Sequence, residues 1–228
     1  MSTNRKEFVV MPVTQYYPIG SITVSSSWLA FIIGFVITYL FIRIYFGKTH
    51  SDRVGNLFFN VIIIWKLSVI LTDFSTVVAY PMSILYFHGG KIGWLLAISV
   101  VGLLTLRQAY REKWQRIDQW TLLLALISWQ TTYQVVMVFL NEGSVVVKIG
   151  TVVAFVVFTL LAIWSYRKSI NKTSELVGIW VAVHFMVAAF QSGGMLQLAF
   201  ITTIVMGSLI VGVEYISAER TSRKEEVQ

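Results

Sequence analysis

The chain has no cysteine, only three prolines among its 228 residues, and little charge. Without cysteine it can form no disulfide and offers no thiolate to a metal or a substrate. Its prolines, Pro12, Pro18 and Pro81, all lie outside the long apolar runs. Charged residues make up 13% of the chain, about half the share of a typical soluble domain. These deficits argue against a soluble or disulfide-stabilised domain.

Long apolar runs take the place of the missing charge, since 56% of the residues are hydrophobic. A helix that crosses the hydrocarbon core of a bilayer needs about 20 predominantly apolar residues. The stretches that meet or approach this length are residues 28–46, 55–75, 91–106, 118–140, 145–166, 175–191 and 195–216. The sequence therefore predicts an all-α integral membrane protein with seven transmembrane helices.

The net charge of +7 is explained by topology, and a nucleic-acid partner is not needed. Lysine and arginine gather after the first, third, fifth and seventh runs, and the alternate loops are poor in both. By the positive-inside rule the N-terminus lies outside and the C-terminus lies in the cytoplasm. We therefore expect an extracytoplasmic membrane-surface arm over residues 1–27, a transmembrane domain over 28–216 and a cytoplasmic tail over 217–228. The expected location is the plasma membrane of a bacterium.

Polar residues inside the apolar runs are the candidate functional residues, because burying them in a membrane is costly. Lys66 lies in the second run and His184 in the sixth, while Gln130 and Gln134 are four residues apart on one helical face. Each has two interpretations, since such residues either line a polar cavity or hydrogen-bond neighbouring helices. His50 follows the first run, where we expect it to be solvated. The three histidines are scattered, so the sequence predicts no metal site and no cofactor.

Several stretches match the pattern of a known family between residues 17 and 216. They are "YPIGSITVSSSWLAFIIGF", "NLFFNVIIIWKLSVIL", "YPMSILYFHGGKIG", "IDQWTLLLAL" and "GGMLQLAF". Together they resemble the bacterial prolipoprotein diacylglyceryl transferases, in which Lys66 takes the place of an arginine and Gln197 that of a recurring glutamine. The resemblance implies seven helices, an outer arm and transfer of the diacylglyceryl group of phosphatidylglycerol to the thiol of a lipobox cysteine.

The family's catalytic signatures are poorly kept. Where its fourth helix carries Gly-Arg-x-Gly-Asn-Phe-x-Asn, this chain reads "QTTYQVVMVF", with Thr132 at the arginine and Val135 at the asparagine. An arginine, a glutamate and an arginine of the sixth helix are replaced by His184, Ala188 and Gln191. The outer head segment between helices four and five is reduced to "NEGS". The arginine sites that can be aligned have thus lost the guanidinium groups that would offset the charge of a departing glycerol phosphate.

His88, in "YFHGGKIG", is the candidate catalytic base, and two alignments remain open for it. Counted from Pro81, the two glycines after it match a structural glycine pair of the family. If several residues are deleted instead, His88 becomes the family's histidine. A neutral histidine at this place could deprotonate a thiol.

The sequence favours a redirected or non-catalytic relative of this family. We expect it to bind an anionic phospholipid, phosphatidylglycerol, in a cavity lined by Lys66, Gln130, Gln134, His184 and Gln197. Its role would be lipid or lipoprotein handling, with a lipoprotein precursor or another membrane protein as partner. The alternatives are an active phosphatidylglycerol–prolipoprotein diacylglyceryl transferase and a small-solute carrier. The carrier is the less favoured of these, because the chain has no internal repeat and no proline-broken span.

Overall fold

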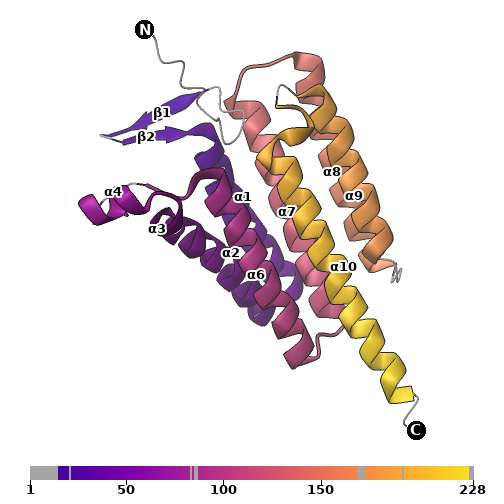
Figure 1. Cartoon of the computed structure of the whole chain (residues 1–228). Helices are drawn as coiled ribbons and strands as arrows, with labels where there is room; N and C mark the ends of the chain where they lie inside the picture. Colours follow the sequence, from indigo (N-terminus) through magenta and orange to yellow (C-terminus); the bar gives the residue numbers. More distant parts are fainter. Residues whose placement is uncertain are drawn as a thin grey trace.

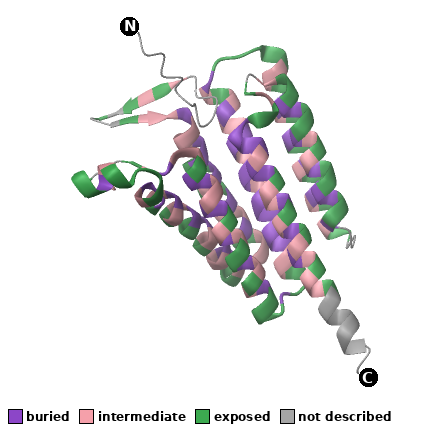
Figure 2. Ribbon diagram, in the orientation of Figure 1, coloured by how far each residue is buried: buried purple, intermediate pink, exposed green. Residues whose placement is uncertain are grey.

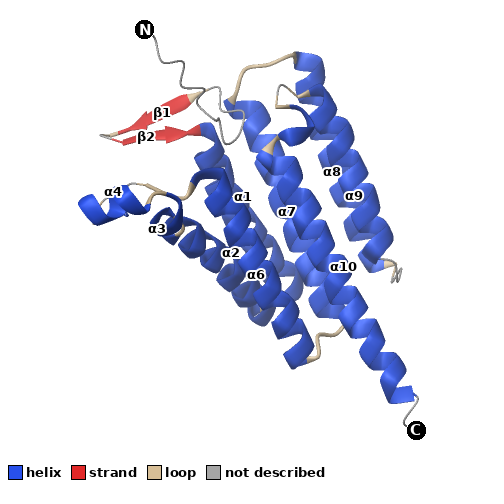
Figure 3. Ribbon diagram, viewed as in Figure 1, coloured by secondary structure: helices blue, strands red, loops and turns tan. Residues whose placement is uncertain are grey.

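The computed structural model describes residues 15–20, 22–82, 84, 87–168, 173–191 and 193–225. Two short strands precede a bundle of helices (Figures 1 and 3). The elements are β1 (Tyr16–Ile19), β2 (Ile22–Ser25), α1 (Ser26–Phe46), α2 (Lys48–Leu67), α3 (Val69–Thr72), α4 (Phe74–Ala79), α6 (Gly90–Glu112), α7 (Arg116–Leu140), α8 (Val145–Arg167), α9 (Thr173–Phe190), η1 (Gly194–Leu196) and α10 (Leu198–Glu225). Within these described residues, seven helical segments are long and apolar enough to cross a membrane, which confirms the predicted seven-helix, multi-pass class.

The N-terminal strands form an antiparallel hairpin in which Tyr16 lies opposite Ser25. Gly20, with a φ of +64°, takes the left-handed conformation that its turn requires. Ser25 then caps α1, because its hydroxyl accepts a hydrogen bond from the backbone N–H of Trp28. The hydroxyl of Tyr17 donates to the carbonyl oxygen of Leu140 at 2.7 Å, which ties the hairpin to the end of α7. The first 14 residues of the predicted arm lie outside the described residues, and the membrane-surface position of the arm stays a prediction.

Helix α7 is the centre of the bundle, as the purple residues along it show (Figure 2). In its most apolar window 61% of the residues are buried, against 22% in α8. On one side the rings of Phe31, Trp65, Trp94 and Trp129 pack between α1, α2, α6 and α7. On the other, apolar side chains of α7 pack with those of α8, α9 and α10, including Trp180. The apolar faces of the outer helices remain exposed, as expected for helices surrounded by lipid.

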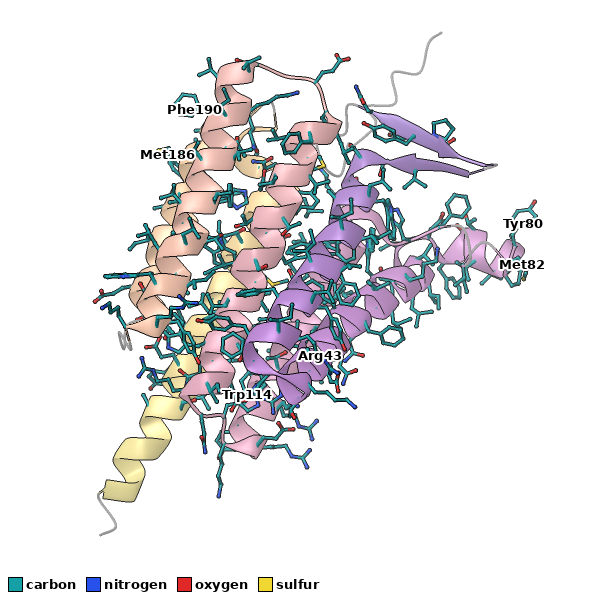
Figure 4. The ribbon with its side chains drawn as sticks, turned by 180° about the vertical axis from the view of Figure 1, so that it is seen from behind. Arg43, Tyr80, Met82, Trp114, Met186 and Phe190 are labelled. Carbon is teal, nitrogen blue, oxygen red and sulfur yellow. The ribbon has the colours of Figure 1, made fainter. Side chains whose placement is uncertain are left out.

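The second predicted run, 55–75, is not one helix. Helix α2 begins earlier, at Lys48, and ends at Leu67, and the chain turns again at Asp73, whose φ of −146° and ψ of 57° are not helical. Helix α4 then leaves the bundle, and Tyr80 and Met82 lie at the far end of this segment (Figures 1 and 4). The third helix is longer than the predicted 91–106, since α6 continues through its basic end to Glu112. Similarly, α10 continues to Glu225 through most of the predicted tail, and residues 226–228 lie outside the described residues.

Candidate functional site

A chain of hydrogen-bonded side chains crosses the bundle between α7, α9 and the start of α10. Gln197 Nε2 donates to Gln191 Oε1 at 2.9 Å, and Gln191 Nε2 donates to Gln134 Oε1 at 3.2 Å. Gln134 Nε2 lies 3.2 Å from His184 Nε2, and His184 Nδ1 lies 2.7 Å from the hydroxyl of Thr203. We call these five residues the amide relay. It joins side chains that are up to 69 positions apart in the sequence.

The directions of these bonds assign the tautomer of His184. Because Gln134 accepts through its oxygen, its nitrogen must donate, and His184 Nε2 is then the acceptor. His184 Nδ1 therefore carries the hydrogen and donates it to Thr203, whose hydroxyl donates in turn to the carbonyl oxygen of Ala199 at 3.2 Å. His184 is fully buried, and both of its ring nitrogens are occupied. It is held neutral, so it cannot serve as a free base without breaking the relay.

A cavity of about 350 Å³ opens beside the relay, and we call it the amide cavity. Its lining comes from the end of α7, the start of α8, the end of α9 and the start of α10. The residues that line it are Tyr133, Gln134, Met137, Val138, Asn141, Glu142, Gly143, Ser144, Val147, Lys148, Thr151, Phe190, Gln191, Gln197 and Ala199. Phe190, labelled in Figure 4, is largely exposed at the end of α9. The cavity therefore joins an amide-rich wall and one lysine to an apolar outer surface.

The structure brings together only some of the five residues predicted to share a cavity. Gln134 and Gln197 line the amide cavity, and His184 reaches it through Gln134. Gln130 is buried one turn away on α7, and its amide nitrogen has no hydrogen-bond partner among the described residues. Neither Gln130 nor Lys66 is among the residues that line the cavity.

Two lining residues were not singled out from the sequence as site residues. Gln191 was noted only as the replacement of a family arginine, and Lys148 looked like an ordinary lysine near a helix end. Thr203, the terminal member of the relay, also gave no signal. Threonine is common in these apolar runs and usually bonds the carbonyl oxygen four residues earlier.

His88 lies apart from the amide cavity, in the segment that joins α4 to α6. Its ring centroid is 4.4 Å from that of Trp65 and 6.4 Å from that of Trp28. His88 Nδ1 accepts a hydrogen bond from the backbone N–H of Gly90, and Trp65 Nε1 donates to the Gly90 carbonyl oxygen at 2.9 Å. Burial lowers the pKa of His88 below its ordinary value, and the positive charge of Lys66 lowers it further. His88 is therefore a neutral, half-buried ring with Lys66 in its surroundings.

The glycines around His88 permit a close approach to α2. A Cβ atom at Gly89 or at Gly93 would lie 2.0 Å from the hydroxyl oxygen of Ser68. Gly90, with a φ of +60°, adopts the left-handed conformation. Both members of the glycine pair thus have structural roles.

A polar cluster at the opposite end of the bundle corrects the expectation for His50. Arg53 forms salt bridges with Asp118 and, at 3.2 Å, with Glu112, and its guanidinium carbon lies 4.8 Å from the ring centroid of Trp114. His50 Nδ1 is buried 3.6 Å from an Asp118 oxygen, so His50 is not a solvated loop residue. Asp118 also accepts from the backbone N–H of Gln115 and completes the capping box that starts α7. The described residues contain no group of three or more acidic, histidine or cysteine side chains placed to hold a metal ion.

Comparison of the chain with protein-family models, with curated protein sequences and with solved structures finds no significant match. The resemblance to the diacylglyceryl transferases thus rests on the motifs given above and stays a prediction.

Proposed function

We propose that this multi-pass membrane protein binds the headgroup of phosphatidylglycerol in the amide cavity and acts in lipid or lipoprotein handling without catalysing diacylglyceryl transfer. The observation that carries the proposal is the convergence of Gln134, Gln191 and Gln197 on a cavity with Lys148 in its lining. Intramembrane polar side chains that meet at a cavity are the usual sign of a binding site.

The chemistry of the cavity matches a phosphodiester that carries a glycerol. Amide groups both donate and accept hydrogen bonds, as the two hydroxyls of glycerol do. Lys148 supplies one positive charge for the phosphate. Glu142, which also lines the cavity, disfavours additional negative charge, so a singly charged headgroup fits better than a phosphomonoester. An ethanolamine headgroup would bring a second ammonium group close to Lys148.

The same lining argues against group transfer. Departure of glycerol phosphate needs cations that offset its growing charge, and guanidinium groups do this best. No arginine is among the described residues that line the cavity. His184 is occupied at both nitrogens, and His88 is not part of the lining. The redirected role inferred from the missing signatures is therefore the one that this cavity supports best.

The proposal also includes the side of the membrane on which the lipid is bound. We infer from the positive-inside rule that the amide cavity faces the outer side of the membrane, which we take to be a bacterial plasma membrane. The hairpin lies at the same end, since the hydroxyl of Ser26 donates to Asn141 Oδ1 at 2.7 Å. A lipoprotein precursor or another membrane protein would meet the bound lipid there.

Lipid retention by the full-length protein tests the binding proposal. Purified protein is incubated with phosphatidylglycerol and phosphatidylethanolamine of identical acyl chains, and retained lipid is measured by native mass spectrometry. Phosphatidylglycerol should be retained preferentially, and Lys148→Gln should weaken its retention about fivefold, the effect of losing one nearby cation. Lys168→Gln, at the other end of α8, is the matched control. Equal retention by the two lysine variants would refute the headgroup assignment.

A cellular assay separates binding from catalysis. The protein is expressed in bacteria depleted of their own diacylglyceryl transferase, and a reporter prolipoprotein is examined for the mass of an added diacylglyceryl group. We expect no modification. Restored modification would overturn the non-catalytic assignment in favour of an active transferase. Substrate-dependent flux in proteoliposomes would favour the carrier instead.

A further inference from the structure

Two further cavities lie side by side at the end of the bundle opposite to the amide cavity. The larger is polar, encloses about 670 Å³ and lies between the start of α2 and the end of α6. Lys48, Asn56 and Asn60 line it from α2, and Gln108 and Glu112 line it from α6. Arg43 and Trp114, labelled in Figure 4, mark this end, far from Phe190 at the other.

Positive charge at this end is only partly neutralised. Arg43 lies 4.0 Å from Asp52, and Arg53 is paired with both Glu112 and Asp118. The acidic side chains around the polar cavity are therefore already engaged.

Three other cations at this end have no such partner. Lys48, Arg107 and Arg111 form no ion pair within 4.0 Å among the described residues. Lys48 lines the polar cavity, while Arg107 and Arg111 line a smaller one beside it that shares Gln108 and Glu112. One uncompensated cation thus lines the polar cavity and two line the neighbouring one, across the shared Gln108 and Glu112, and this local excess of positive charge favours an anionic ligand.

An apolar cavity of about 340 Å³ adjoins this polar space. It lies between α2, α6, α7 and α10, and almost all of its exposed lining is apolar. Leu57 lines both the apolar and the polar cavity, so the two meet at that residue. Gly102 and Ser99 of α6 contribute to the lining, and Gly102 leaves space there because it has no side chain. The helices that form this cavity are four of the membrane-spanning segments.

We propose that this surface is a binding site for an anionic glycerophospholipid of the leaflet opposite to the amide cavity. The phosphate lies among Lys48, Arg107 and Arg111, and one acyl chain fills the apolar cavity beyond Leu57. A soluble phosphate would use the cations and leave the apolar space open, whereas a phospholipid fills both. The site is independent of the proposed function, because it shares no lining residue with the amide cavity.

A photoreactive lipid tests the site directly. Full-length protein is reconstituted with phosphatidylglycerol that carries a diazirine on its acyl chain, irradiated and digested, and labelled peptides are identified by mass spectrometry. The matched probe is phosphatidylcholine with the same diazirine chain. We expect phosphatidylglycerol to label residues 98–106 and 205–209 severalfold more than phosphatidylcholine does.

Variants with matched controls separate the headgroup and chain contacts. Lys48→Gln/Arg107→Gln should lower phosphatidylglycerol labelling at least about fivefold, since each cation near a lipid surface contributes about that factor. Its control is Lys113→Gln/Lys168→Gln, which removes two exposed lysines from the same end of the bundle. Gly102→Leu should block the chain and lower labelling, whereas Gly150→Leu, on the open face of α8, should not.

Size-exclusion chromatography and thermal unfolding check that each variant folds. Ser99→Leu, at an exposed position of the same cavity, takes the place of Gly102→Leu if that variant does not fold. Equal labelling by the two lipids, or equal loss in the charge variant and its control, would overturn the proposal. Labelling confined to peptides around Lys148 would also overturn it and leave the amide cavity as the sole lipid site.

Discussion

Replacing Gly93 by alanine tests how tightly α6 approaches α2. The new Cβ atom would lie 2.0 Å from Ser68 Oγ, 3.1 Å from Ser68 Cβ and 3.3 Å from Trp65 Cδ1. Ordinary contacts of a Cβ atom lie at 3.4 Å or more, so Ser68 Oγ would have to move by about 1.4 Å or the two helices would have to separate. Ser68 Oγ is itself held by a 2.6 Å bond to the Trp65 carbonyl oxygen. Overpacking of this kind costs about 1–3 kcal/mol.

Gly150→Ala is the matched control for Gly93→Ala. Gly150 is also helical, but a Cβ atom there would meet nothing within 4 Å. Both substitutions gain the same helix propensity of about 1 kcal/mol, so the difference between them isolates the packing cost. We expect Gly93→Ala to be less stable than Gly150→Ala by about 1–3 kcal/mol.

The measurement is reversible unfolding of the protein in mixed detergent micelles, followed by tryptophan fluorescence. A double-mutant cycle with Ser68→Ala tests whether the loss of stability comes from the clash with Ser68 Oγ, because removing the hydroxyl relieves the shortest contact. The coupling energy between the two sites should be about 1 kcal/mol or more. Equal unfolding free energies for Gly93→Ala and Gly150→Ala would refute the close approach of the helices.

Three further predictions follow from the polar contacts. The fold lowers the pKa of His88, so the folded protein favours the neutral ring. The contribution of neutral His88 to the unfolding free energy is fully present above the ordinary pKa of about 6.5 and is lost as the pH falls through the lowered value. The melting temperature should therefore fall between pH 8 and pH 5, and His88→Gln should reduce that fall; identical pH profiles would contradict the prediction. His184→Leu should cost about 1–3 kcal/mol of unfolding free energy, since it strands the buried amide of Gln134; a fully neutral effect would argue against the relay. Asp118→Asn should lower the unfolding free energy by a similar amount, because Arg53 loses the more buried of its two carboxylate partners; Asp52→Asn, at a more exposed pair, should cost less.

The spans could be predicted because a bilayer imposes a local requirement. About 20 consecutive apolar residues are needed for each crossing, and this is visible without knowledge of neighbouring helices. The residues at which the helices begin and end were less predictable. The third helix continues past its apolar run through Arg107 and Arg111, because an exposed charged turn extends a helix as readily as an apolar one. The break at Asp73 was not predicted, although Thr72, Asp73, Ser75 and Thr76 interrupt the apolar run there.

The candidate site was predictable in part for the same reason. Gln134 and His184 stand out because they are polar in apolar surroundings, and the structure links them directly. Their two interpretations, interhelical bonding and cavity lining, are both true of Gln134. Whether the other residues of the amide relay belong to the site depends on which helices are neighbours, and no local sequence pattern shows this. Thr203 looks like any other threonine of a span until α9 is placed beside α10.

Helix α10 also has a consequence for how the protein is made. Adjacent residues of this last helix satisfy donors on two separate helices: Thr202 accepts from Trp94 Nε1 on α6 at 2.8 Å, and Thr203 accepts from His184 on α9. The helices that carry these donors are synthesised before α10, which carries both acceptors. Until α10 is in place, each donor is without this partner, and an unpaired donor in hydrocarbon is costly in free energy. Insertion of α10 therefore supplies hydrogen-bond partners for donors on two different helices in one step.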